Sequence, residues 1–247
     1  GDYDNDGWQD LYVATQQTDN DYLYHNNGDG TFTRVTAGSV VNEKLGAQVG
    51  AWGDLNNDGF LDLVVGRRDS NNALYLNNGN SNNWVKFKLI GAISNRGVIG
   101  AKVRVNAVLN RNRNPNPIWQ LQELSGGSGW EAQNDVRPNF GLGDASSAET
   151  VRIEWPSGIV QEMHGVAAKQ FLTVTEAGAG ILPFKQELVV GSNLTFRAAT
   201  TLPGPVNYQW RFNGADLPGE TNPTLVVQNA QTATAGEYTV VISKPDG

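Results

Sequence analysis

The sequence contains no cysteine, no long apolar run and only two histidines among its 247 residues. Without cysteine the chain cannot form disulfide bonds or carry out thiol redox chemistry. A membrane-spanning helix needs roughly 18 or more apolar residues in succession, and because no such run is present we expect no membrane span. Lys and Arg number 18 against 25 Asp and Glu, for a formal net charge of −7. That balance does not suit a nucleic-acid-binding surface, so we expect no nucleic-acid partner.

Helical spacing of apolar residues is also missing from the sequence. The 29 glycines and 10 prolines indicate frequent turns and therefore short strands. Where apolar residues cluster, they alternate with polar ones, which is the period of a β-strand. We therefore predict an all-β protein, with a length sufficient for two or three domains.

An internal repeat occupies the first third of the chain. Residues 1–13 (GDYDNDGWQDLYV) match residues 53–65 (GDLNNDGFLDLVV), and residues 23–28 match residues 74–79. The expected strands of the two units cover residues 11–14, 22–25, 63–65 and 73–76. A unit of about 50 residues with up to four short strands has the size of a β-propeller blade. Because the sequence starts inside the first motif, we expect it to be the C-terminal part of a longer protein.

Acidic side chains alternate in a loop at the start of each repeat, and seven of the 25 acidic residues lie in these two loops. Ca²⁺ takes about six to eight oxygen ligands; carboxylates at positions 1, 3 and 5 of a tight loop converge on one point, and glycine at position 6 permits the sharp turn. Position 7 can add a backbone carbonyl and position 9 a last carboxylate. In the first loop these residues are Asp2, Asp4, Asp6, Trp8 through its carbonyl, and Asp10. In the second loop they are Asp54, Asn56, Asp58, Phe60 through its carbonyl, and Asp62. We predict one Ca²⁺ in each.

Other interpretations of the two loops are weaker. An EF-hand has Glu at position 12 and helices on both sides, whereas strand-like sequence follows these loops. A metal-free turn rich in Asp is the main alternative, but four converging carboxylates would repel one another. Mg²⁺ is less suited to a flexible cage of protein oxygens, and Zn²⁺ is disfavoured because neither loop contains His or Cys. No base or nucleophile accompanies the loops, so we expect a structural ion, no catalytic residues and no enzymatic activity.

From residue 84 onward the pattern changes to longer alternating strands. Residues 84–90 and 101–105 alternate apolar and basic side chains, which predicts half-buried antiparallel strands. Two more strands are expected at residues 151–155 and 171–175. Residues 176–180 (EAGAG) are predicted to form a linker.

The C-terminal segment has the layout of an immunoglobulin-like β-sandwich. Trp210 is expected in its core and Tyr238 at a corner before a late strand. Ala198 and Val240 stand where a disulfide would lie, and their small or apolar side chains are compatible with a packed core that lacks the bridge.

Few residues outside the loops are candidates for function. We predict that His25 and His164 are surface residues rather than general bases. Trp119 and Trp130 are the only candidates for a sugar-binding platform, and core packing is the preferred prediction for both.

Three polar segments have simple interpretations. Residues 110–117 (NRNRNPNP) are expected to form a hairpin tip, with a basic binding loop as the alternative. Residues 125–129 (SGGSG) lack the lysine and helix of a phosphate-binding loop, so we predict a flexible turn. Asn193 begins a formal glycosylation sequon, which matters only in a eukaryotic source.

The two Asp loops and their following strands resemble FG-GAP/VCBS repeats, the blades of integrin-α-like β-propellers. The resemblance implies a propeller of about seven blades that binds Ca²⁺ through these loop positions. Residues 84–177 resemble the ASPIC/UnbV domain, which follows such repeats in the cartilage acidic protein 1 family and in many bacterial exported proteins. This second resemblance is carried by residues 94–97 (SNRG), 99–103 (IGAKV), 123–129 (ELSGGSG), 133–135 (QND), 140–143 (FGLG) and 151–158 (VRIEWPSG).

These resemblances predict three parts. Residues 1–83 would hold two FG-GAP/VCBS calcium-binding repeats, residues 84–177 an ASPIC/UnbV domain, and residues 181–247 an Ig-like domain without a disulfide. The cartilage protein continues with a cysteine-bearing EGF-like module, so the Ig-like module here favours a bacterial modular protein.

We therefore expect a secreted or cell-surface calcium-binding protein that mediates adhesion or extracellular binding. Its partner would be an extracellular protein or glycan, and self-association is compatible with the modular layout. Two alternatives remain open: an accessory C-terminal region of a larger exported enzyme, and a structural spacer in a self-assembling surface polymer.

Overall fold

The computed structural model describes residues 1–16, 20–44, 46–68, 70–109, 116–182, 189–202 and 204–243. Strands make up 45% of the structure and helix 3%, which confirms the all-β prediction. The helical elements in the described ranges are two short 3₁₀ turns, η1 (Ser39–Val41) and η2 (Thr232–Thr234). In these ranges no helix has the length and apolar character needed to cross a bilayer.

The chain divides into two compact units. The first contains Gly1–Lys88, Lys102–Ile153 and Glu162–Val174, and the second contains Leu89–Ala101, Glu154–Gln161 and Thr175–Gly247. Both Asp loops and the segments that contact them lie in the first unit. The predicted domain boundaries at residues 83/84 and 177/181 stay predictions.

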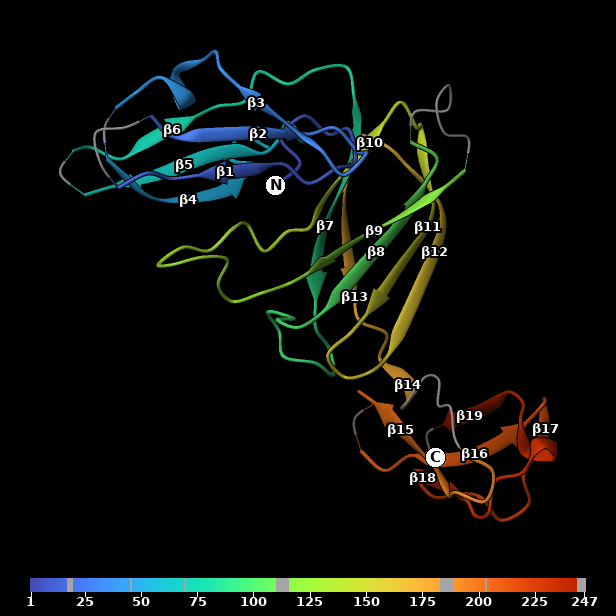
Figure 1. Cartoon of the computed structure of the whole chain (residues 1–247). Helices are drawn as coiled ribbons and strands as arrows, with labels where there is room; N and C mark the ends of the chain where they lie inside the picture. The colour runs from blue at the N-terminus through green and yellow to red at the C-terminus, as the bar shows by residue number, and fades with distance from the viewer. Residues whose placement is uncertain are drawn as a thin grey trace. The chain divides into compact units, whose positions relative to one another are not determined.

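Each repeat folds into an open three-stranded antiparallel sheet (Figure 1). The first sheet has the order β1-β2-β3, with β1 (Leu11–Val13), β2 (Tyr22–Asn26) and β3 (Phe32–Val35). The second has the order β4-β5-β6, with β4 (Ala47–Gly53), β5 (Asp62–Arg67) and β6 (Ala73–Tyr75). The four expected strands are present with ends shifted by one or two residues. A propeller blade has four strands, so each sheet is one strand short of a complete blade.

Two strands of the repeats, β3 and β4, were not expected from the sequence. β3 is almost entirely exposed and so lacks a buried apolar face. β4 contains Gly50 in its interior, a residue that weakens a strand unless another group approaches the backbone closely. A Cβ on Gly50 would lie 2.6 Å from the Tyr12 ring, so tight packing explains this glycine. The second Asp loop therefore joins two paired strands, β4 and β5.

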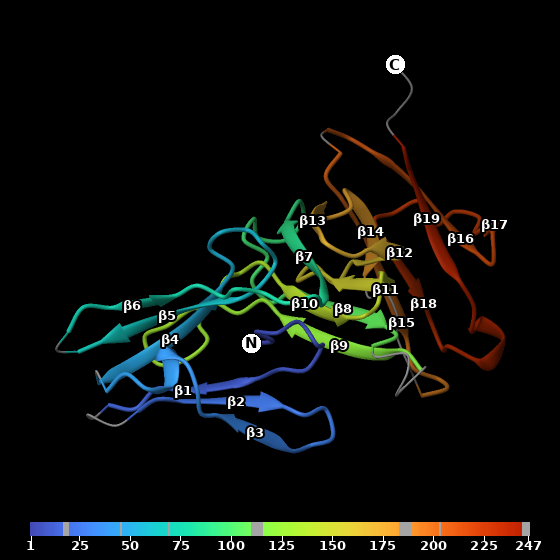
Figure 2. The same ribbon diagram turned by 90° about the horizontal axis from the view of Figure 1, so that it is seen from above.

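The middle of the chain forms two further sheets, seen beside each other in Figures 1 and 2. One has the order β10-β7-β13, with β7 (Asn83–Ile90), β10 (Asn139–Gly143) and β13 (Gln170–Thr175). The other has the order β12-β11-β8-β9, with β8 (Lys102–Ala107), β9 (Ile118–Glu123), β11 (Ser147–Glu154) and β12 (Val160–Ala167). The side-chain amides of Gln120 and Gln122 on β9 donate to the carbonyls of Gly141 (2.7 Å) and Asn139 on β10. These bonds join the two sheets at that edge.

The alternation predicted for the two strands after residue 84 holds for one and fails for the other. β8 alternates as expected, with Val103, Val105 and Ala107 fully buried. β7 is instead buried on both faces from Trp84 to Phe87. On the face that carries Lys86, the ammonium lies against Asp54 of the second Asp loop and against Asp135. Lys86 is therefore a fully buried lysine, where the pattern indicated a half-exposed one.

The C-terminal part is a β-sandwich of two three-stranded sheets. One has the order β14-β15-β18, with β14 (Ala179–Leu182), β15 (Leu194–Thr200) and β18 (Thr224–Val227). The other has the order β17-β16-β19, with β16 (Asn207–Phe212), β17 (Ala215–Asp216) and β19 (Tyr238–Ser243). The linker predicted at residues 176–180 is wrong in its second half, because Ala179 pairs with Thr200 and Gly180 with Ala199 in β15.

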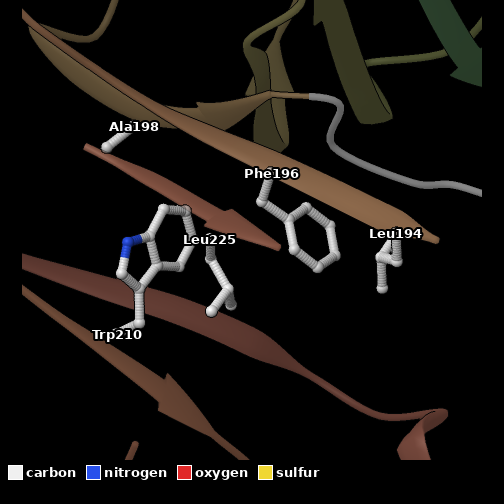
Figure 3. Packing of buried hydrophobic residues seen from close by; sticks show 5 residues of the cluster. All are labelled: Leu194, Phe196, Ala198, Trp210 and Leu225. Atoms are coloured by element: carbon white, nitrogen blue, oxygen red, sulfur yellow. The ribbon is translucent and has the colours of Figure 1, made fainter. Parts of the chain in front are cut away.

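One apolar cluster fills the space between these two sheets (Figure 3). Trp210 of β16 is fully buried and packs against Phe196 of β15, with ring centroids 6.2 Å apart. Ala198 is buried in the same cluster and Val240 packs against it, as the cysteine-free core requires. Tyr238, predicted at a corner before a late strand, is the first residue of β19. Its hydroxyl donates to the Thr234 carbonyl at 2.9 Å, the kind of bond that a corner tyrosine makes.

Glu176 begins the predicted linker and is buried in a dense set of hydrogen bonds. Its carboxylate accepts the consecutive backbone N–H groups of Ala92, Ile93 and Ser94 at 2.7–2.8 Å. The Ser94 and Ser157 hydroxyls donate to its other oxygen at 2.8 and 2.5 Å. Burial opposes ionisation, but these donors outweigh it and hold the pKa of Glu176 below its usual value of 4.5.

Candidate metal centre

The first Asp loop winds around the carboxylate of Asp2. This carboxylate is fully buried and accepts the backbone N–H groups of Asp6 at 3.2 Å and Gly7 at 3.0 Å. The tight path requires left-handed backbone at Asn5 (φ 57°) and at Gly7 (φ 96°). Asn and Gly are the residues that adopt this conformation at the lowest cost, which explains their positions in the loop.

Asp10 closes the same loop. Its two carboxylate oxygens accept the N–H of Tyr3 at 3.0 Å and the N–H of Asn26, at the end of β2, at 2.8 Å. Its side chain has no exposed surface. The loop is thereby tied both to itself and to the neighbouring strand.

The predicted side-chain ligands of this loop meet at one place. Carboxylate oxygens of Asp2, Asp4 and Asp6 lie within 4.8 Å of one another, and Asp4 and Asp10 belong to a second group with the same limit. The Trp8 N–H donates to the Asp6 carboxylate at 2.9 Å, which places the Trp8 backbone beside the cluster. Coordination by the Trp8 carbonyl stays a prediction.

The second Asp loop repeats the first bond for bond. Asp54 accepts the N–H groups of Asp58 at 3.1 Å and Gly59 at 3.0 Å. Asp62 accepts those of Leu55 and Asn77 at 2.8 Å each. The Phe60 N–H donates to Asp58 at 2.8 Å, which places the Phe60 backbone beside the second loop. Coordination of an ion by the Phe60 carbonyl, like that by the Trp8 carbonyl, stays a prediction.

The backbone of the second loop also takes the same left-handed turn, at Asn57 (φ 59°) and Gly59 (φ 90°). The two loops contact each other through Asn5, whose buried side-chain amide donates to the Gly59 carbonyl at 2.9 Å. Asn77 of the second repeat donates in return to the Tyr3 carbonyl at 2.6 Å. The two candidate sites are therefore adjacent and share hydrogen bonds.

Charge accumulates in the first loop. Burial, reinforced by the carboxylates of Asp6, Asp10 and Asp4, raises the pKa of Asp2 well above its usual range. Burial also raises the pKa of Asp6 to about 6 and raises that of Asp10. Carboxylates that disfavour one another's ionisation are stabilised by a cation placed between them. The predicted divalent cation in the first loop would therefore offset unfavourable charge.

The second loop differs from the first in its charge. It has Asn56 in place of Asp4, and the Asn56 amide donates to the Asp58 carboxylate at 2.8 Å. It also has an internal cation, because the buried Lys86 ammonium lies 3.3 Å from the Asp54 carboxylate. We therefore expect the second loop to attract a divalent cation less strongly than the first.

Residues 133–137 hold the second loop in place. The Asp135 carboxylate lies 3.0 Å from the Lys86 ammonium and 2.7 Å from the Arg137 guanidinium. Arg137 donates to the Asp54 carbonyl at 2.8 Å and to the Asn57 side chain at 2.7 Å. Burial alone would raise the pKa of Asp135, but Arg137 and Lys86 keep it below its usual range. The QND motif was identified from sequence as part of a resemblance and received no role there.

His25 is the main residue of the site that the sequence analysis missed. We predicted a surface residue, whereas its side chain is only 30% exposed and lies against the first loop. Its Nδ1 is 3.2 Å from an Asp4 oxygen and 3.4 Å from an Asp10 oxygen. The residue sits on β2, and the pairing of β1 with β2 brings it back to the loop.

The predictions for the other candidate residues were partly correct. His164 is exposed on β12 and contacts Thr150, as a surface residue should. The core packing predicted for Trp119 and Trp130 is wrong, because they are 53% and 63% exposed. In residues 125–129 the Ser125 hydroxyl donates to the Gly127 carbonyl at 2.7 Å, so this segment closes on itself as a turn.

Two polar segments complete the predicted candidates. Asn193 is exposed, and its side-chain oxygen accepts the Asn229 N–H at 3.0 Å. Most of the predicted hairpin tip at residues 110–117 lies outside the described residues, which resume at residue 116.

The fold and the paired Asp loops define an all-β, multi-part protein with a repeated Asp loop. The sequence matches the FG-GAP-like repeat family over residues 2–65 and the ASPIC and UnbV family over residues 91–181. The chain thus contains an FG-GAP-like repeat region followed by an ASPIC/UnbV domain, as both resemblances predicted. These two domains indicate a modular protein of the extracellular or cell-surface type.

No curated protein matches this sequence. Among solved structures, the chain is similar to the crystal structure of the N-terminal four Ig domains of Dscam1 isoform 8.4, with 11% identity and a TM-score of 0.25. That alignment covers 94% of this chain and 59% of the Dscam1 chain. The corresponding structure of isoform 9.44 gives 13% identity, a TM-score of 0.25, and coverage of 76% and 51%. At such TM-scores the likeness assigns no fold, so the Ig-like identity of the C-terminal sandwich stays a prediction.

Proposed function

We propose that this chain belongs to a secreted or cell-surface binding protein whose two Asp loops bind Ca²⁺ as a structural ion. The observation that carries the proposal is that the two loops form the same hydrogen bonds at equivalent positions. A chance cluster of acidic residues would not be built twice with the same strained backbone.

Calcium is favoured because the loop ligands predicted from spacing are all oxygens. Ca²⁺ accepts flexible sets of carboxylate and carbonyl oxygens, while Mg²⁺ demands near-ideal octahedral geometry and retains several waters. An ion at the centre of Asp2, Asp4 and Asp6 would offset the repulsion among these carboxylates. Together with burial, which is the larger cause, neighbouring carboxylates raise the pKa of Asp2 and of Asp6. The ion would also hold the start of β1 beside the end of β2.

A structural role is favoured over a catalytic one. The buried Asp2, Asp10, Asp54 and Asp62 carboxylates are engaged by backbone N–H groups, so they serve to shape the loops. We accordingly propose no enzymatic activity for this chain. Its proposed partner is an extracellular protein or glycan that contacts the modules these loops stabilise.

Thermal unfolding tests the structural role of calcium. A ligand that binds only the folded state raises stability by about 2.7 kcal/mol at a concentration of 100 times its Kd. We expect Ca²⁺ added to chelated protein to raise the melting temperature of the first unit. Asp4→Ala and Asp58→Ala should each reduce that shift. An equal shift in both variants and the parent protein would contradict binding at these loops.

The partner is tested with the same variants. Immobilised glycans and extracellular matrix proteins are probed with the parent chain and with Asp4→Ala, each in Ca²⁺ and in chelator. A partner that requires the folded repeats should be retained in Ca²⁺ and released by chelator. If the partner is retained equally in Ca²⁺ and in chelator, and equally by the parent and Asp4→Ala, then binding of the partner does not depend on the loops.

A further inference from the structure

We propose that the first loop, unlike the second, is a mixed nitrogen and oxygen site in which His25 adds an imidazole ligand, so that it also takes a transition-metal dication such as Zn²⁺. The inference concerns the loop of the proposed Ca²⁺ site, but it does not require that Ca²⁺ binds there. It revises the sequence-based argument against Zn²⁺, which rested on the absence of His within the loop itself.

The spacing of the three groups is the spacing of ligands on one small ion. His25 Nδ1 lies 3.2 Å from Asp4 Oδ2 and 3.4 Å from Asp10 Oδ1. Neighbouring ligands on a tetrahedral Zn²⁺, with bonds of about 2.0–2.1 Å, are about 3.3 Å apart. One coordination sphere can therefore take Nδ1 and both carboxylate oxygens with little rearrangement.

In the described structure the imidazole lies against the carboxylates of the first loop, and its Nδ1 forms no hydrogen bond with them. This nitrogen is buried, and a buried polar atom without a partner is costly unless something satisfies it. Its Nε2 faces the Asp6 carboxylate at 3.9 Å. A ligating histidine commonly directs its other ring nitrogen at a carboxylate, which orients the ring and increases its basicity.

The second repeat provides the comparison. In the internal alignment His25 corresponds to Leu76, so the second loop has no nitrogen donor at this place. It has the Lys86 ammonium beside Asp54 instead. Imidazole favours zinc and similar ions, while an all-oxygen set suits calcium, so the two loops should differ in the ions they accept.

Two residues of the first-loop site border a cavity. Asp6 and His25 line a cavity of about 670 Å³ that opens from the first loop, together with Trp8, Asn27 and Gly28. The alternative is that His25 is simply a protonated counterion for the loop carboxylates. In that case its removal would affect all dications alike.

Titration of the whole chelator-treated chain with Zn²⁺ alone, Co²⁺ alone and Ca²⁺ alone distinguishes the two cases. The key variant is His25→Leu, which copies the second repeat, and His164→Leu removes the other histidine as a matched control. We expect His25→Leu to weaken Zn²⁺ and Co²⁺ binding by roughly tenfold to a hundredfold, at least the loss that outer-shell substitutions cause. Its Ca²⁺ affinity should change little, and His164→Leu should bind all three ions as the parent does.

A spectroscopic readout excludes mere loss of folding. Four-coordinate Co²⁺ gives a stronger visible absorption band than six-coordinate Co²⁺. The parent protein and His164→Leu should show this band, and His25→Leu should lose it while retaining the parent's circular dichroism. Equal Zn²⁺ affinity in the parent and His25→Leu would overturn the inference. Zn²⁺ binding without Ca²⁺ binding would overturn the proposed function alone, and the reverse result would overturn the inference alone.

Discussion

At the scale of single residues, charge separates two loops that share one backbone design. The first loop has four carboxylates, while the second has three, with Asn56 where the first has Asp4. Lys86 adds a positive charge beside Asp54. Ligand charge is one of the factors that tune the affinity of calcium loops, so the first loop should be filled before the second.

Exchange of one residue between the loops tests this order. Asp4→Asn should weaken Ca²⁺ binding at the first loop, and Asn56→Asp should strengthen binding at the second, each on the order of tenfold through ligand charge. Isothermal calorimetry of each variant against the parent gives both affinities. If both variants bind Ca²⁺ with the affinities of the parent at both loops, charge at this position does not set the order of filling.

The buried carboxylate of Glu176 predicts a dependence of stability on pH. The folded-state pKa of Glu176 lies below its usual value of 4.5, so the unfolded state binds the proton more readily. The stabilisation is therefore complete above about pH 4.5 and is lost as pH falls through the folded-state pKa. Acid unfolding monitored by tryptophan fluorescence should show this loss.

Glu176→Gln serves as the comparison for that measurement. Loss of a charged acceptor for buried N–H groups should cost about 1.5–3 kcal/mol of the free energy of unfolding at pH 7. The difference in the free energy of unfolding between Glu176→Gln and the parent should become smaller at acidic pH. A difference of constant size from pH 7 to pH 3 would show that the charge of Glu176 is not responsible.

At the scale of elements, the hairpin of β4 and β5 depends on a segment that lies far from it in the sequence. Arg137 bonds to Asp54 and Asn57 of the hairpin loop, and the Asp135 N–H donates to the Trp52 carbonyl at 2.8 Å. These contacts support the second loop, whose ion we expect to be bound more weakly. Residues 133–137 should therefore limit its local opening.

Amide hydrogen exchange tests this support. Arg137→Ala should speed exchange at the loop amides of Asp58, Gly59 and Phe60, because their loop loses two hydrogen bonds. The corresponding amides of the first loop should change much less, which provides an internal control. Faster exchange throughout both loops would indicate general destabilisation instead of local support.

At the scale of the whole molecule, the sequence predicted what depends on local spacing. The Asp alternation and the Gly at position 6 determine the loop, and the structure reproduces that loop twice. The buried position of Trp210 and the corner position of Tyr238 were likewise predicted, because each follows from a short strand pattern. All-β architecture followed from the alternation itself.

Features that depend on contacts between distant segments were not predicted. His25 reaches the first loop only because β1 pairs with β2, and Glu176 is buried only because residues 92–94 fold around it. The pattern around Lys86 predicted a half-exposed lysine, whereas its ammonium is buried against Asp54 and Asp135, which are distant from it in sequence. Trp119 lies on β9 at the edge of its sheet, so its exposure depends on strand order rather than local sequence.

Calorimetric titration of Ca²⁺ into the chelated chain tests the central claim most directly. We predict saturable binding of two ions per chain, with affinities of about 10⁻⁴–10⁻³ M or tighter, as in extracellular calcium modules. Asp4→Ala should abolish the tighter event and Asp58→Ala the weaker one. No saturable heat from a chain that includes the complete set of repeats would contradict the account.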